Sequence, residues 1–131
     1  MENDCIFCKL IEDKHNIYND DICYAKMDKY PSGHGHLLVI SKKHHENILV
    51  TPDDTVSHMF LVAKRLGIKL KEKLGSDGIV ISTNTGKEAG QIIFHFHIHV
   101  IPKYVNAKEG FVKHQELTEK EEIEFKKLLS N

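Results

Sequence analysis

The sequence predicts an α+β fold, a meandering antiparallel sheet of about five strands with one long helix. Short runs of apolar and β-branched residues, separated by turn residues, predict the strands. The stretch from 51 to 75 instead repeats its apolar residues every three to four positions, as a helix covering a sheet does. Because 131 residues suit one hydrophobic core, we expect a single domain over 1–131.

The amino-terminal third predicts a short helix and three strands. Asp4 can cap a helix that ends near Glu12, within an amino-terminal unit of residues 1–12. Residues 17–19 and 22–27 are typical of a hairpin, and its Cys23 is expected in the core. After a loop rich in breakers, His36 begins a strand to Ser41, whose continuous apolar run is suited to burial on both faces.

The long helix and the carboxyl-terminal segment carry their own end signals. Thr51 is expected as the N-cap, Pro52 as the first helical residue and Gly75 as the terminator. A strand over 79–83 and a glycine-containing loop follow. The tail of 103–131 is expected to be irregular until Thr118, where a Thr-x-x-Glu capping box opens a final helix to about Leu129.

Three histidines alternate with apolar residues over 94–101, which predicts a strand near the middle of the sheet. His95, His97 and His99 would then share one face, which no ordinary surface strand explains. Residues four apart on a strand are about 13 Å apart at the backbone, whereas a zinc–nitrogen bond is about 2.1 Å. The three imidazoles therefore cannot easily share one metal ion. At least one, with His97 the first candidate, is left for chemistry or for binding an anion.

Several motifs together resemble those of the histidine-triad (HIT) family of nucleotide hydrolases and transferases. The run from His95 to Ile101 is similar to its His-x-His-x-His signature, and 84–91 to its Asn-x-Gly-x-x-x-Gly-Gln phosphate loop. Residues 28–44, from an aspartate to a Lys-Lys-His, and the first cysteine pair also match in order. The resemblance covers nearly the whole chain and implies a HIT-like fold in a homodimer.

The resemblance also implies site roles. His97 is expected as the nucleophile, with His99 and His36 beside the phosphate. Asp28 is expected to bind ribose, although an aspartate there could simply form a turn. The loop residues that would contact phosphate or ribose are Asn84, Gly90 and Gln91, although most glycine-containing loops bind nothing. Ile92 is a departure, because many relatives carry a hydroxyl residue there.

The Cys5-x-x-Cys8 pair predicts a structural Zn²⁺, which a tetrahedral site with two cysteines and two histidines would bind. Zinc-bearing relatives use the positions of His44 and His95, and His45 is a rival to His44. The alternative is two ordinary helix cysteines. The remaining histidines are expected in a loop (His34) or on the surface: His15, His58 and His114.

The composition limits the kinds of ligand and partner that we expect. Eighteen basic and nineteen acidic residues nearly cancel, which gives no argument for nucleic acid or a membrane. Arg65 is the only arginine, so phosphate must be held by histidines, lysines and backbone amides. The start does not resemble a signal peptide, and three cysteines favour the cytoplasm.

These observations favour hydrolysis or transfer at the α-phosphate of a purine nucleotide conjugate, such as a nucleoside 5′-phosphoramidate, through a nucleotidyl-histidine intermediate without a catalytic cofactor. The first alternative is a dinucleoside polyphosphate hydrolase. The second is a nucleotide-binding regulatory module with little turnover, and a third is a zinc-stabilised interaction domain.

Overall fold

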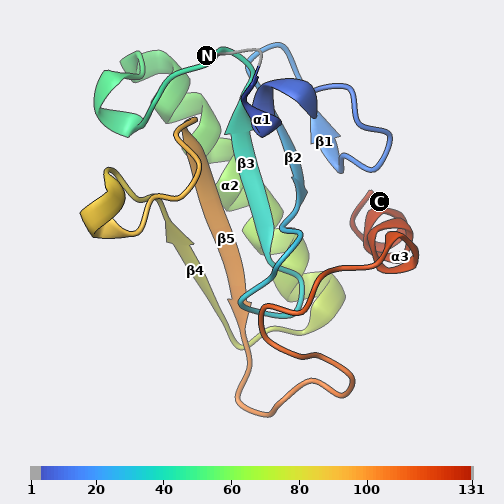
Figure 1. The fold of residues 1–131 in the computed structure, drawn as a ribbon. Helices are drawn as coiled ribbons and strands as arrows, with labels where there is room; N and C mark the ends of the chain where they lie inside the picture. The colour runs from blue at the N-terminus through green and yellow to red at the C-terminus, as the bar shows by residue number, and fades with distance from the viewer. Residues whose placement is uncertain (1–3, 131) are drawn as a thin grey trace.

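A five-stranded antiparallel sheet in the order β1-β2-β3-β5-β4 forms the centre of the fold (Figure 1). The computed structural model describes residues 4–130. The strands are β1 (Tyr18–Asn19), β2 (Cys23–Met27), β3 (Leu37–Ser41), β4 (Gly78–Ser82) and β5 (His97–Lys103). Chain order is followed except that β5 pairs with both β3 and β4, which places the histidine strand inside the sheet. The predicted α+β class and antiparallel sheet are confirmed.

Helix α2 (Asp53–Leu74) covers one face of the sheet (Figure 1). Its apolar side packs on alternate residues of β2, β3 and β5, as the three-to-four spacing predicted. Gly75 ends it in the left-handed conformation, with φ of 67°. The N-cap is Pro52, not Thr51, because the Thr51 hydroxyl donates backward to the Asn47 carbonyl, 2.7 Å away.

The opposite face is covered only in part, by the single-turn helix α1 (Ile6–Lys9). Phe7 packs there with Tyr24, Leu38 and Ile40. The expectation of a helix from Asp4 to Glu12 is wrong in length, since Cys5 is the N-cap and the chain turns after Lys9; residues 1–3 of the amino-terminal unit lie outside the described residues. Such a short helix depends on tertiary contacts.

Helix α3 (Glu119–Leu129) begins at the predicted capping box. The Thr118 hydroxyl accepts from the Glu121 amide, and the Glu121 carboxylate accepts from the Thr118 amide. Phe125 and Leu129 anchor α3 in the main core. Two 3₁₀ turns, η2 (Ile48–Val50) and η3 (Lys87–Ala89), complete the described elements. In the described part of the chain, no helix combines the length and apolar character needed to cross a bilayer.

The predicted strand over 94–101 is correct in its alternation but begins too early. Phe96, Ile98 and Val100 are buried in the core beneath α2. Phe94 is exposed, and β5 begins only at His97, where pairing with Ile40 starts. The segment before it pairs differently: the Phe96 amide donates to the His45 carbonyl over 2.6 Å.

Candidate functional site

Nine side chains on three adjacent strand lines form the face of the sheet opposite α2, here called the site face. Alternation along each strand sends every second residue to this face. The register aligns them in rows, since Lys26 pairs with Leu38 and Leu38 with His99. The site face comprises Tyr24, Lys26, Asp28, His36, Leu38, Ile40, His97, His99 and Ile101. Residues more than 60 positions apart in sequence therefore become direct neighbours.

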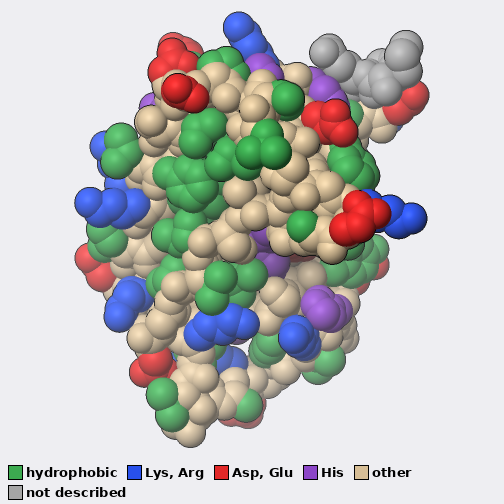
Figure 2. All heavy atoms as spheres, turned by 90° about the vertical axis from the view of Figure 1, so that its left-hand side faces the viewer, with side chains coloured by type: hydrophobic (Ala, Val, Ile, Leu, Met, Phe, Trp, Pro, Cys, Tyr) green, Lys and Arg blue, Asp and Glu red, His purple; other side chains and the backbone are tan. Residues whose placement is uncertain are grey.

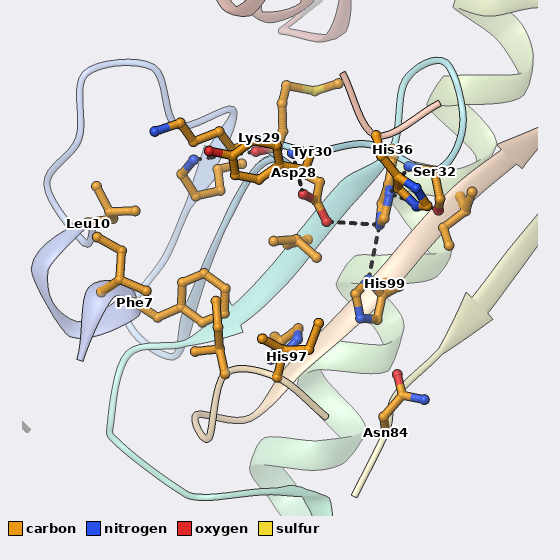
Figure 3. A pocket seen from close by; sticks show the side chains of 18 of the residues that line it. Phe7, Leu10, Asp28, Lys29, Tyr30, Ser32, His36, Asn84, His97 and His99 are labelled. Carbon is orange, nitrogen blue, oxygen red and sulfur yellow. Dashed lines mark hydrogen bonds and ion pairs between the residues drawn. The ribbon is translucent and has the colours of Figure 1, made fainter. Parts of the chain in front are cut away.

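A cavity of about 790 Å³ opens over the part of the site face that α1 leaves uncovered. Phe7 closes one side, with its ring edge-on to His97 at a centroid distance of 5.0 Å. Asp28, His36, His97 and His99 face the cavity from the sheet (Figure 3). Carboxylate and imidazole groups are thus collected beside an apolar surface, an arrangement typical of small-molecule sites.

His97 carries a free lone pair at the cavity. Its Nδ1 lies 2.7 Å from the His95 carbonyl oxygen, which can only accept, so Nδ1 holds the proton. Nε2 is then unprotonated and available for attack. Burial lowers the pKa of His97, against opposing contributions from the His95 carbonyl and the Asp28 carboxylate. The imidazole therefore stays neutral and nucleophilic at physiological pH.

A chain of hydrogen bonds fixes the tautomers of His36 and His99. The Ser32 amide donates to His36 Nδ1 over 3.1 Å, so the His36 proton is on Nε2. His36 Nε2 lies 3.0 Å from His99 Nδ1, which accepts from it and leaves the His99 proton on Nε2 (Figure 3). Burial lowers the pKa of His36 to about 4, which preserves this neutral arrangement. His97 and His99 thus have opposite tautomers, one an acceptor and one a donor at Nε2.

Asp28 divides its two oxygens between a turn and the cavity. Oδ1 accepts from the Tyr30 amide over 2.8 Å, which is the turn-forming role. Oδ2 lies 3.4 Å from His36 Nε2 at the edge of the cavity (Figure 3). That second oxygen has capacity left to accept a hydroxyl group of a ligand.

The loop over 84–91 borders the cavity, but many of its polar groups are hydrogen-bonded within the loop or to nearby carbonyls. Gly86 and Gly90 have φ of 90° and 92°, which explains the two glycines. The Asn84 amide donates to the Ala89 carbonyl, and buried Gln91 donates to the carbonyls of Glu46 and Ile93 while accepting from the Gly86 amide. Ile92 lines the cavity and is 87% exposed, so it offers the ligand an apolar contact and no hydroxyl group.

Cys5, Cys8, His44 and His95 converge in a second cluster beside α1, with one ligand atom each, all within 4.8 Å of one another. His95 Nδ1 lies 3.3 Å from Cys5 Sγ and 3.1 Å from His44 Nδ1. Tetrahedral Zn²⁺ with nitrogen and sulfur ligands separates them by about 3.3 to 3.8 Å. His95 Nε2 lies 2.6 Å from the Ser41 carbonyl, so its lone pair at Nδ1 faces the cluster. This donor set fits zinc, and it includes His44 rather than the rival His45.

The other histidines have structural partners. His58 contacts the Asp20 carboxylate over 2.6 Å, and Tyr18 donates to the same carboxylate. His15 was expected on the surface, but its side chain is only 14% exposed because it packs at α3 and contacts Glu119. His34 lies in its predicted loop, against Phe125 of α3.

Two polar groups at the cavity, from Ser32 and Lys26, were not predicted from the sequence motifs. The Ser32 amide could not be identified because a backbone donor has no sequence signal. Lys26 does have one, as a charged residue in the middle of an apolar strand. Cys23 is buried, as predicted.

One face of the antiparallel sheet is only partly covered. There, a neutral histidine with a free Nε2 lone pair, a second histidine with an Nε2–H donor and a carboxylate border one cavity. The HIT domain model matches residues 10–106. The chain belongs to the HIT family.

Curated relatives support this assignment. An uncharacterized HIT-like protein of Saccharolobus solfataricus is 38% identical over 103 residues, covering 76% of this chain and 74% of that protein. The adenylylsulfatase HINT3 of Arabidopsis thaliana is 38% identical over 106 residues, covering 79% of this chain and 54% of the plant protein.

Solved structures of HIT family proteins superpose on nearly the whole chain. A hypothetical histidine triad nucleotide-binding protein from Sulfolobus tokodaii superposes with a TM-score of 0.90 at 34% identity, covering 96% of this chain and 89% of that one. A zinc-bound histidine triad family protein from Mycobacterium smegmatis gives a TM-score of 0.81 at 32% identity, with coverage of 99% and 93%.

Proposed function

We propose that the protein hydrolyses or transfers nucleoside 5′-phosphate groups, attacking the α-phosphorus of a purine nucleotide conjugate such as a phosphoramidate. The observation that carries this proposal is the tautomer of His97, whose Nδ1–H is engaged by the His95 carbonyl and whose Nε2 lone pair is free at the cavity. The names of two relatives, a nucleotide-binding protein and an adenylylsulfatase, point to the same ligand class.

In the first step His97 Nε2 forms a bond to the α-phosphorus while the bond to the leaving group breaks. The leaving group takes the bonding electrons, and an amine also takes a proton from solvent as it departs. His99 Nε2–H is a suitable hydrogen-bond donor to the phosphoryl oxygens, and the His36–Ser32 chain holds it in the donor tautomer. Preorganised donors of this kind contribute several kcal/mol to transition-state stabilisation.

In the second step water attacks the same phosphorus and displaces His97, and the proton that the water oxygen gives up passes to solvent. The products are the nucleoside monophosphate and the restored neutral imidazole. Splitting one difficult displacement into two is the general advantage of covalent catalysis. Asp28 would hold the ribose hydroxyls through its cavity oxygen, and the Asn84, Gly90 and Gln91 loop would limit the position of the phosphate.

The exposed Ile92 favours a related candidate, hydrolysis of dinucleoside polyphosphates. A phosphate leaving group can depart without an added proton, whereas an amine leaving group needs one. The absence of a hydroxyl at position 92 therefore handicaps amine departure more.

We also propose that zinc at the Cys5, Cys8, His44 and His95 cluster is structural. The cluster ties α1 to the sheet, and neither His97 nor His99 belongs to it. Zinc would supply only cross-linking there.

A homodimer is a further proposal: edge strand β4 exposes Val80 and Ile81, and hydrophobic side chains gather on that side of the molecule (Figure 2). The odd number of cysteines supports a cytoplasmic location.

Rapid mixing with a radiolabelled nucleoside phosphoramidate, followed by alkaline quench, tests the mechanism. Wild-type protein should accumulate an acid-labile nucleotide adduct at His97. His97→Ala should bind nucleotide without forming the adduct. Its turnover rate should fall by more than the roughly 100- to 10,000-fold expected when a general acid–base residue is removed. The matched His99→Ala variant should still form the adduct, only slowly. A His97→Ala protein with wild-type turnover would eliminate the proposal.

A further inference from the structure

Lys26 is a buried lysine on the site face for which the reaction above has no use. It is 8% exposed and lines the cavity. Within residues 4–130, its Nζ makes one hydrogen bond, a long one of 3.3 Å to the Met27 carbonyl. A lysine amino group has three N–H donors and no acceptor, so further donors remain for the cavity. A ligand that displaces cavity water must supply acceptors to them, because an unsatisfied buried donor weakens binding.

The register places Lys26 away from the reacting phosphate. Lys26, Leu38 and His99 form one row across β2, β3 and β5, so two strand spacings, about 10 Å, separate the backbones of Lys26 and His99. On its own strand line, Asp28 is the next residue on this face. A nucleotide with its phosphate at His97 and its ribose at Asp28 therefore extends from β5 toward β2.

The cavity beyond the ribose position is suited to a flat ring. Ile6, Phe7 and Leu10 of the α1 segment line it with apolar side chains, and Lys26 is a polar group on the sheet side. The neighbouring Lys29 is engaged elsewhere, since its Nζ lies 3.6 Å from the Glu116 carboxylate. Lys26 is thus the lysine positioned to meet the edge of a base.

We infer that Lys26 is a specificity-determining residue that reads the base, and that the site prefers a 6-oxopurine, guanine or hypoxanthine, to adenine. This inference rests on the proposed function. Guanine and hypoxanthine present two adjacent acceptors, O6 and N7, which suit a group that only donates. Adenine replaces O6 with an amino donor, which leaves the lysine facing another donor.

Titration calorimetry with nucleoside 5′-monophosphates tests the inference, because they lack a leaving group. Wild-type protein should bind IMP and GMP about tenfold more tightly than AMP. In Lys26→Met, the IMP and GMP affinities should fall to the AMP level. The affinities for AMP and for ribose 5-phosphate, which has no base, should change by less than about threefold. Lys42→Met is the matched control, since Lys42 does not line the cavity and donates to the Asn19 side chain outside it.

Each other outcome overturns the inference in a recognisable way. Equal wild-type affinity for AMP and IMP removes the base preference without needing any variant. Equal weakening of all four ligands in Lys26→Met assigns the lysine to phosphate or ribose. If no nucleotide binds wild-type protein, the proposed function itself fails, whereas binding without base preference defeats only the inference.

Discussion

Replacing Cys8 by serine should remove the metal from the cluster and release α1 from the sheet. Cys8 Sγ lies 3.3 Å from His44 Nδ1 and 3.6 Å from His95 Nδ1, so it contacts both histidines of the cluster. A serine hydroxyl is a poor replacement for a thiolate at zinc. A single helical turn is not stable without its anchor.

The size of the effect follows from what α1 buries. Phe7 is 4% exposed, and exposing a buried phenylalanine costs about 1.5 to 3 kcal/mol. Tyr24 would also lose the Phe7 carbonyl that accepts from its hydroxyl, a bond worth about 1 kcal/mol. The sum is about 2.5 to 4 kcal/mol, which for a domain of this size corresponds to a Tm lower by roughly 10 to 15 °C.

Elemental analysis and thermal unfolding of untagged protein measure the two effects. We expect one zinc per chain in wild-type protein, none in Cys8→Ser, and only a modest loss of activity. Cys23→Ser is the matched control, because Cys23 is buried in the other core and should lower Tm while keeping the metal. Full zinc occupancy in Cys8→Ser, or no zinc in wild-type protein, would refute the reasoning.

Three further changes probe the site and the fold. Ile92→Ser should speed substrates with amine leaving groups more than those with phosphate leaving groups in parallel steady-state assays; equal gains would contradict this role. Asp20→Asn should lower the free energy of unfolding by about 1 to 2 kcal/mol at pH 7 in urea titrations. Although burial acts to raise the pKa of Asp20, hydrogen bonds from Tyr18, His58 and two amides hold it well below its usual range. The ionised Asp20 therefore stabilises the folded protein at pH values above the pKa that Asp20 has in the unfolded chain. The difference in free energy of unfolding between wild type and Asp20→Asn should shrink as the pH falls below about 4; a constant difference would exclude this cause. Gly35→Ala should destabilise by more than about 1 kcal/mol in the same assay, because φ is +90° and an added Cβ would lie 2.4 Å from Leu74 Cδ1; unchanged stability would show that the turn relaxes.

The sequence predicted elements whose signals are local. The Thr118 capping box and the Gly75 terminator depend on nearest neighbours and were correct. The start of β5 was misplaced because Phe94 continues the alternation while its backbone lies outside the ladder. Register across strands decides such ends, and it is not encoded in any short stretch.

In the candidate site too, some features could be predicted from local sequence patterns and others depend on contacts between distant residues. The cysteine pair and the three alternating histidines are visible as patterns, and the structure brings Cys5 and Cys8 together with His44 and His95. The tautomer of His99 was not predictable, because it depends on the Ser32 amide through His36. The self-bonding of Gln91 within its loop was equally invisible, since it requires the carbonyl of Glu46.

The alignment of β3 between β2 and β5 makes the protein intolerant of length changes in one short place. Leu37 and Val39 belong to the core beneath α2, while Leu38 lies on the floor of the cavity. One residue inserted into β3 would exchange these two sets, exposing core side chains to the cavity and turning the site face toward α2. Length variation is therefore best accommodated at the exposed segment around Val105, outside β5, where no side chain of the site face is displaced.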